Sequence, residues 1–400
     1  MLLPVRAWPL ARAVGLTALA TSAVLSACTA PGLAGSTGTG SVGSSVASPG
    51  PALAWTPVAL PAGVAVRTLT TMGDRLLVGG LAAGSPPAPV MLTLDAGGAS
   101  SRVPLTPASG YAFEARWYSV ATDGTKIIAI GGATGGAHSN VRWTTWTGTA
   151  AGVKEVPQSF YAFGGWGAGD LVDAVTTPGG DALVGSWGGA KAGLDAAVWT
   201  ESGDVWTRQD PAGTALESTA TLLVGPRAAT RDGAGILVAG SALHLVPGSV
   251  NQAAAVWRSA GVDTGWHRVD LSDPGTYSEA VSATCGEAGA GTCVVLGQVD
   301  GSLAVWELDG DTPRRQGGIP AIAVGDKDVV PAPVLHGSDA VVVSPDGSRT
   351  AVLVRASGTW HTSTGPAGTP AAAAAVGGRL YVATRTTTDG PTTLWAAALP

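Results

Sequence analysis

Residues 174–186 (AVTTPGGDALVGS) and 196–206 (AAVWTESGDVW) form one unit of a pattern that recurs along the chain. Each unit has a Gly-containing turn, a short β-branched strand ending in Gly, a polar loop, the motif AVW and a second turn. Further copies are found at 228–240 (AATRDGAGILVAG) with 254–266 (AAVWRSAGVDTGW), and at 283–297 (ATCGEAGAGTCVVLG) with 303–310 (LAVWELDG). A repeat of this length made only of strands is typical of one four-stranded blade of a β-propeller.

Seven such repeats predict an all-β, seven-bladed β-propeller over residues 51–400. The predicted blades cover residues 64–105, 118–156, 173–209, 227–270, 278–318, 334–362 and 373–399.

The last predicted blade has no fourth strand before the chain ends. Residues 54–58 (AWTPV) resemble the outer strands at 205–208 (VWTR) and 265–268 (GWHR). We therefore predict that the N-terminal segment supplies the outermost strand of blade seven. This pairing would close the ring without leaving exposed sheet edges.

The first 28 residues have the features of a targeting segment. Arg6 and Arg12 form a basic region, and residues 13–25 form an apolar stretch too short to span a bilayer comfortably. The stretch ends in LSAC at residues 25–28, which resembles a bacterial lipobox, so Cys28 is the predicted acylation site. The alternative is an ordinary secretory signal in which Cys28 is incidental.

Residues 29–50 (TAPGLAGSTGTGSVGSSVASPG) are predicted to be a flexible Gly/Ser/Thr linker. A linker of this composition has a root-mean-square reach of about 25 Å. With Cys28 acylated, the domain would be anchored through this linker to the outer face of the bacterial cell membrane.

Composition and charge exclude some functions. The chain has 22 basic and 28 acidic residues, and the part after residue 28 has a net charge near −8 because it lacks Arg6 and Arg12. An acidic domain argues against nucleic-acid binding, and against any membrane contact other than the lipid anchor. The excess of Ala, Gly and Arg is typical of a high-GC, actinobacterial genome.

Cys285 and Cys293 remain once Cys28 is set aside. They flank the turn of a predicted hairpin in blade five and should pair outside the cytoplasm. Closing this nine-residue loop would stabilise the fold by ~2.6 kcal/mol in the chain-entropy model. No CxxC motif is present, so we interpret the pair as structural.

The segments after AVW resemble the Asp-box repeat of sialidase-like propellers, in which a Ser or Thr, an Asp, a Gly and an aromatic residue recur. Residues 200–206 (TESGDVW) follow this order with Ser202 in place of Asp, and Gly358 and Trp360 match its end. The resemblance implies the fold. Enzymes of that family use three arginines, a Tyr–Glu pair and an Asp, and no motif here maps onto that set, so no catalytic residue is predicted.

Aromatic residues are concentrated in two connectors between blades, at 110–118 (GYAFEARWY) and 160–166 (FYAFGGW). Such connectors emerge on the face that carries ligand sites in many propellers, and aromatic rings suit sugar faces or apolar peptides. The alternative is that the rings fold inward and plug the channel. The candidate ligand-binding residues are Tyr111, Phe113, Arg116, Trp117, Tyr118, Phe160, Tyr161, Phe163 and Trp166.

Together these patterns predict an extracytoplasmic lipoprotein with a non-catalytic binding or scaffolding propeller. The expected partner is a cell-envelope glycan or a protein, and we expect a monomer. The alternative is a diverged sialidase-like glycoside hydrolase or lyase, which a carboxylate pair at the channel mouth would favour. No cofactor and no metal are predicted, because the five His residues are scattered and lack metal-ligand spacing.

Overall fold

The computed structural model describes residues 48–135, 140–286, 292–337, 339–387 and 390–399. The predicted signal segment, with Cys28, and nearly all of the predicted linker lie outside these ranges. Ser48 and Pro49, near the end of the predicted linker, form strand β1. No helix in the described ranges is long and apolar enough to cross a bilayer.

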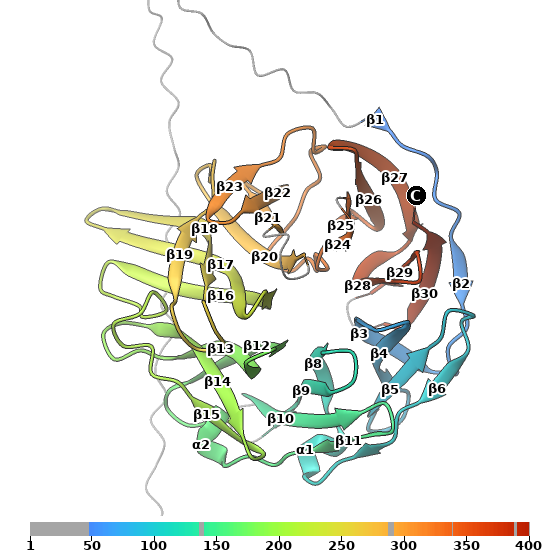
Figure 1. The fold of residues 1–400 in the computed structure, drawn as a ribbon, viewed down its shortest axis with the longest axis horizontal. Helices are drawn as coiled ribbons and strands as arrows, with labels where there is room; N and C mark the ends of the chain where they lie inside the picture. Colours follow the sequence, from blue (N-terminus) through green and yellow to red (C-terminus); the bar gives the residue numbers. More distant parts are fainter. Residues whose placement is uncertain (1–47, 136–139, 287–291, 338, 388–389, 400) are drawn as a thin grey trace, which may run out of the picture. The chain divides into compact units, whose positions relative to one another are not determined.

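Seven antiparallel sheets are arranged in a ring, which confirms the predicted seven-bladed propeller (Figure 1). Each blade begins with its innermost strand. The strands are β3 (Val64–Met72), β4 (Arg75–Ala82), β5 (Ala88–Leu94) and β6 (Ser100–Arg102) in blade 1; β8 (Arg116–Thr122), β9 (Ile127–Gly135), β10 (Asn140–Thr149) and β11 (Gly152–Glu155) in blade 2; β12 (Ala168–Thr177), β13 (Gly180–Gly188), β14 (Leu194–Ser202) and β15 (Val205–Arg208) in blade 3; β16 (Leu222–Asp232), β17 (Gly235–Val246), β18 (Ser249–Arg258) and β19 (His267–Asp270) in blade 4; β20 (Ser278–Cys285), β21 (Thr292–Val299), β22 (Ser302–Asp309) and β23 (Thr312–Arg315) in blade 5; β24 (Val334–His336), β25 (Asp339–Asp346), β26 (Arg349–Ala356) and β27 (Thr359–Ala367) in blade 6; and β28 (Thr369–Val376), β29 (Arg379–Arg385) and β30 (Thr392–Ala398) in blade 7.

The N-terminal segment closes the ring as predicted. Strand β2 (Thr56–Val58) pairs antiparallel with β30 and becomes the fourth strand of blade 7. Just before it, β1 (Ser48–Pro49) pairs parallel with β27 of blade 6. In Figure 1 the chain therefore runs along the outer edges of blades 6 and 7. A second short parallel strand, β7 (Leu105–Thr106), covers the outer edge of blade 2 in the same way.

The hydrophobic core consists of seven clusters, and each cluster joins two adjacent blades. Trp146, Trp199, Trp257 and Trp306 occupy the third strands of blades 2 to 5 and are at most 1% exposed. Large flat side chains fill the wedge between two twisted sheets, which explains why AVW recurs at this position in blades 3, 4 and 5. The described strands and the core clusters all lie within the compact unit Ser44–Pro400.

Six of the seven inner strands carry a register shift at the same place, where one residue bulges out of the pairing. A bulge changes the direction in which the side chain of the bulged residue points. All six bulged residues line the central channel of the ring: Arg67, Tyr118, Val172, Arg227, Val281 and Ala371. The seventh inner strand, β24, is short, and Pro331 and Ala332 complete the channel wall before it.

Candidate functional site

Two short helices lie in the connectors that enter blades 2 and 3, α1 (Gly110–Phe113) and α2 (Phe160–Phe163). The connector of α1 is held by the buried carboxylate of Glu155, which accepts hydrogen bonds of 2.6 Å from the Ala108 amide, the Ser109 amide and the Ser109 hydroxyl. Ser109 in turn caps the helix by accepting from the Ala112 amide. These bonds to the outer strand β11 explain why a polar residue is buried beside the aromatic connectors.

The α2 connector presents large aromatic side chains to solvent. Phe160 is 54% exposed, Tyr161 is 77% exposed and Trp166 is fully exposed. Burying a ring of this size against a ligand removes considerable apolar surface from water, so full exposure of a Trp in an otherwise well-packed domain indicates a contact surface.

These rings border a depression that we call the aromatic groove. It consists of one hollow of about 830 Å³ and an adjoining one of about 230 Å³. Both hollows are lined by Arg142 and Trp143 of β10 and by Phe160 and Phe163 of α2. Trp166 and Asp170 border the larger hollow. Its volume falls within the usual range of small-ligand sites.

Ring contacts order the groove. The Arg142 guanidinium lies 5.2 Å from the centre of the Phe160 ring, and Phe160 makes an edge contact with Tyr161 at 5.4 Å. Trp143 makes an edge contact with Tyr118 at 4.8 Å. Because Tyr118 is also a bulged residue of the channel wall, the groove and the channel mouth meet at this pair.

The structure brings together only some of the candidate ligand-binding residues. Phe160, Phe163 and Trp166 line the aromatic groove, and Tyr111 lines its smaller hollow. Tyr118 lines neither hollow but contacts the groove residue Trp143. Tyr161 projects beside Phe160. Phe113 lies elsewhere, in a hollow of about 210 Å³ with Pro89, Arg102 and Leu105, and Arg116 lines a different pocket.

Two of these candidates are core residues. Trp117 is 4% exposed, donates a hydrogen bond of 3.0 Å from Nε1 to the Val90 carbonyl and packs edge-on against Trp146. Phe163 is 7% exposed and packs against Trp199. Both rings are held between blades, so they support the groove and offer little surface to a ligand.

Trp143 and Arg142 are groove residues that the sequence interpretation missed. The signal was present in residues 141–146 (VRWTTW). Successive side chains of a strand point to opposite faces, so two Trp residues three apart cannot both enter the same core. Trp146 is the buried one, and Trp143 is left to face the groove.

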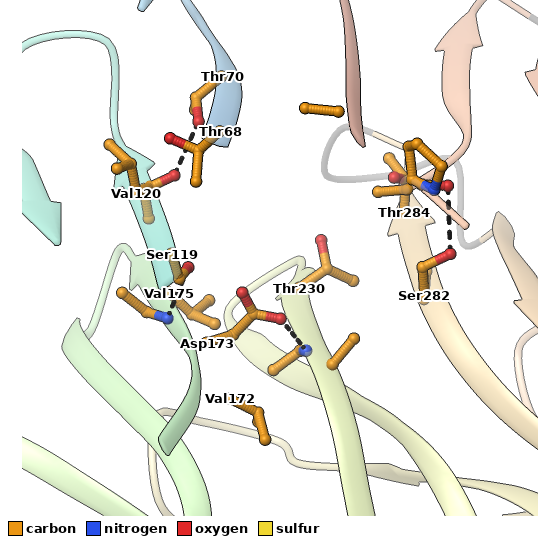
Figure 2. A pocket seen from close by; sticks show the side chains of 18 of the residues that line it. Thr68, Thr70, Ser119, Val120, Val172, Asp173, Val175, Thr230, Ser282 and Thr284 are labelled. Carbon is orange, nitrogen blue, oxygen red and sulfur yellow. Dashed lines mark hydrogen bonds between the residues drawn. The ribbon is translucent and has the colours of Figure 1, made fainter. Parts of the chain in front are cut away.

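The aromatic connectors do not plug the channel. Among the described residues, the only aromatic side chain lining it is that of Tyr118. The channel is a cavity of about 520 Å³ whose wall is rich in small and hydroxyl side chains, including Thr70, Ser119, Thr230, Ser282 and Thr284 (Figure 2).

Asp173 is the single carboxylate in the described channel lining. Its Oδ2 accepts a hydrogen bond of 2.7 Å from the Ala229 amide of the next blade (Figure 2). The side chain is half-buried between the inner strands and keeps some surface toward the channel. This burial raises its pKa to about 6, although hydrogen bonds from Ala229 and Ser119 oppose the shift. The described lining therefore has no partner carboxylate of the kind that paired acid–base hydrolysis requires.

The pKa of the Tyr118 hydroxyl is also raised, chiefly by burial. Asp170 adds to this shift, whereas the guanidinium groups of Arg116 and Arg67 oppose it. The junction between groove and channel is thus a mixed-charge environment that keeps the phenol protonated and able to donate a hydrogen bond.

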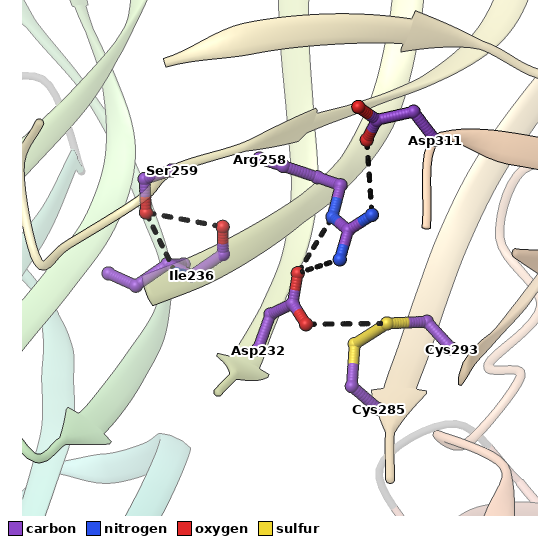
Figure 3. The surroundings of a disulfide bond; sticks show 7 residues. All are labelled: Asp232, Ile236, Arg258, Ser259, Cys285, Cys293 and Asp311. Atoms are coloured by element: carbon purple, nitrogen blue, oxygen red, sulfur yellow. Dashed lines mark hydrogen bonds and ion pairs between the residues drawn. A yellow bond between two sulfur atoms is a disulfide. The ribbon is translucent and has the colours of Figure 1, made fainter. Parts of the chain in front are cut away.

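The structure joins Cys285 and Cys293 in a disulfide across β20 and β21, as predicted (Figure 3). Asp232 lies close enough to both sulfur atoms to suggest a metal site within the described residues. However, the sulfur atoms are bonded to each other, and the Asp232 carboxylate forms an ion pair of 2.6 Å with Arg258. Figure 3 shows this arrangement as a structural link between blades 4 and 5.

Comparisons with known proteins support the fold. The sequence matches no protein-family model and no curated protein. Among solved structures, the β-propeller domain of the trilobed protease from Pyrococcus furiosus has a TM-score of 0.52 at 9% identity over 84% of this chain and 95% of that one. The polysaccharide lyase Uly1 has a TM-score of 0.51 at 10% identity, covering 84% and 90%. The Hadza microbial sialidase Hz136 has a TM-score of 0.48 at 12% identity, covering 82% and 74%.

The chain is therefore a seven-bladed β-propeller, and it shares this backbone fold with the protease domain and with the lyase Uly1. The protease domain is described as having an open velcro topology, whereas here β2 pairs with β30 and closes the ring. At these identities the likeness concerns the backbone only.

Proposed function

We propose that this chain is an extracytoplasmic lipoprotein whose propeller binds a cell-envelope glycan in the aromatic groove. The observation that carries the proposal is the fully exposed Trp166 beside the exposed Phe160 ring at the edge of a hollow of about 830 Å³. A sugar ring has an apolar face that stacks on an aromatic side chain and hydroxyl groups that need polar partners.

The groove offers such polar partners. Within the described residues, the side chains of Arg142 and Asp170 form no ion pair and no hydrogen bond, and the only partner of Arg142 is the Phe160 ring. Gly164, Gly165 and Gly169 line the same hollow and leave the backbone accessible. One cation and one anion beside exposed aromatic rings suit a hydroxyl-rich ligand better than an apolar peptide, which would leave both charges buried and unpaired.

Variants of the groove test this proposal. In the Ser44–Pro400 unit, titrated with an array of cell-wall glycans and followed by tryptophan fluorescence, we expect saturable binding. Trp166→Ala and Phe160→Ala should each weaken it about ten- to thirtyfold, because a stacking residue at the centre of a contact typically contributes about 1.5–2 kcal/mol. Both side chains are exposed, so the unfolding temperature should stay unchanged.

Phe113→Ala is the matched control. Phe113 is 58% exposed, close to the 54% of Phe160, but it lies in a different hollow, so its replacement should leave the affinity unchanged. Equal losses for Phe113→Ala and Phe160→Ala, or no saturable binding to any glycan, would contradict the proposal and favour a protein partner. Appearance of cleaved glycan during the titration would instead favour the hydrolase or lyase alternative.

The proposed localisation depends on Cys28. In the full-length chain produced in a bacterial host, we expect metabolic labelling with a palmitate analogue and recovery in the membrane fraction. Cys28→Ala should abolish the label and release most of the protein to the soluble fraction. If the labelled acid is absent from the wild-type chain, the segment acts as an ordinary secretory signal and the anchor is ruled out.

A further inference from the structure

Two hydroxyl groups on the channel wall have no hydrogen-bond partner within the described residues. The hydroxyls of Thr70, Ser119 and Ser282 form hydrogen bonds with the backbone of neighbouring blades. Those of Thr230 and Thr284 form none, although both half-buried side chains line the same cavity of about 520 Å³ (Figure 2). Each hydroxyl can both donate and accept, so this concave wall is complementary to a hydroxyl-rich molecule.

A line of aromatic rings leads from the aromatic groove to this cavity. Trp143 of β10 lies directly opposite Gly132 of β9, and a Cβ atom at Gly132 would approach the Trp143 ring to 3.4 Å and Val141 Cγ1 to 2.6 Å. The glycine therefore leaves room for the Trp143 ring, which reaches Tyr118 of β8. Two strand spacings, about 10 Å, separate β10 from β8. The rings thus extend the groove inward along blade 2 to the channel mouth.

The channel also offers a strong acceptor. Asp173 Oδ2 accepts a hydrogen bond from the Ala229 amide, and the side chain keeps some surface toward the channel. Its carboxylate can therefore accept a further hydrogen bond from a sugar hydroxyl. An apolar chain end fits less well, because it would leave the carboxylate and the hydroxyls of Thr230 and Thr284 without partners.

We propose that the protein binds a glycan by its end, with the terminal sugar inside the channel and the following sugars along the rings of the groove. This inference rests on the proposed glycan-binding function of the groove. The inner strands of the seven blades surround the channel (Figure 1). An internal stretch of a glycan would have to turn back inside a cavity of about 520 Å³, whereas a chain end enters only once.

End-blocked oligosaccharides test this orientation. Short oligosaccharides cut from the cell-wall glycans of the array are titrated into the Ser44–Pro400 unit in three forms: with both ends free, with the reducing end coupled to streptavidin, and with the non-reducing end coupled to streptavidin. We expect one coupled form to bind as the free form does, and the other to bind at least about tenfold more weakly. Equal affinity for all three forms would overturn end recognition and leave the groove function standing. No binding of any form would overturn both proposals.

Variants of the wall test whether the end lies in the channel. Thr230→Val and Thr284→Val keep the shape of the side chain and remove the hydroxyl, so each should weaken binding of the free oligosaccharide about three- to tenfold. Thr359→Val, at an exposed strand position of blade 6, is the matched control and should change nothing. The unfolding temperature checks that each variant is folded. Unchanged affinity in both channel variants, alongside weaker binding in Trp166→Ala, would show that the glycan stays in the groove and would overturn the channel site.

Discussion

A chain that begins at Ala59 is expected to lose the closed ring. This truncation removes β1 and β2, so blade 7 retains three strands and β30 becomes an open edge. It also removes Leu53 and Trp55, which pack between blades 6 and 7, and Val58, which packs between blades 7 and 1. Partial burial of these three side chains together with the lost hydrogen bonds amounts to roughly 5 kcal/mol of unfolding free energy.

The contacts that would be lost reach two blades. The Trp55 indole donates a hydrogen bond of 3.0 Å to the Thr364 carbonyl, and the Gly50 amide donates one of 2.8 Å to the Thr362 carbonyl. The Ser363 hydroxyl donates a hydrogen bond of 3.0 Å to the Pro51 carbonyl. The segment therefore ties β27 to β30 in addition to completing the last sheet. Loss of such a tie exposes unpaired strand edges, which favours self-association.

Urea unfolding and size-exclusion chromatography measure the effect. We expect a lower midpoint and higher-order species for the truncated chain compared with one that begins at Ser44. A synthetic peptide of residues 48–58, added in excess, should restore the midpoint because it can pair with β30 and β27. An unchanged midpoint and a monomeric elution volume for the truncated chain would show that the closing strand is dispensable.

The architecture could be read from the sequence because it repeats. Seven copies of one pattern average out local ambiguities, and the missing fourth strand of blade 7 pointed directly to residues 54–58. The predicted disulfide followed from two cysteines facing each other across one turn. The repeat does not predict where the pairing between strands becomes irregular. The bulges that direct Arg67 and Tyr118 into the channel are shifts in the pairing of β3 with β4 and of β8 with β9, and no local sequence pattern marks them.

The candidate site was predicted less completely, because clustering of aromatic residues in sequence does not specify their exposure. Phe160 and Phe163 belong to one short helix, yet one faces solvent and the other the core. Contacts between blades determine this outcome, since Phe163 fills space beside Trp199 of β14. Trp143 and Arg142 come from a separate strand and join the groove only through the fold.

Asp173 could not be singled out from the sequence, because its environment is created by neighbouring blades. Inner strands have no partner on their channel side, so side chains of adjacent blades satisfy some of their backbone groups. The Ser119 hydroxyl accepts a hydrogen bond of 3.1 Å from the Ala174 amide, and the Thr70 hydroxyl donates a hydrogen bond of 2.8 Å to the Val120 carbonyl. The Asp173 carboxylate likewise accepts a hydrogen bond from the Ala229 amide, but unlike a hydroxyl it can ionise.

The free energy of unfolding should depend on pH through the ionisation of Asp173. Its pKa in the folded state is about 6, above the ordinary value of 3.8, so the folded protein binds the proton more tightly than the unfolded chain. The contribution of Asp173 to stability is therefore greatest below pH 4 and falls as the pH rises from 4 to 6. The loss approaches about 3 kcal/mol, reduced to the extent that water in the channel screens the charge.

Asp173→Asn isolates this effect, since the amide oxygen can still accept from Ala229 and cannot ionise. We expect the variant to match the wild type near pH 4 and to exceed it in unfolding free energy by up to about 3 kcal/mol at pH 7. Asp173→Ala, which removes the acceptor, should be less stable than Asp173→Asn at every pH. Urea titrations at pH 4, 5, 6 and 7 measure all three proteins. A difference between wild type and Asp173→Asn that stays constant over this range would mean that Asp173 is ionised throughout, and that the channel is wetter than its lining implies.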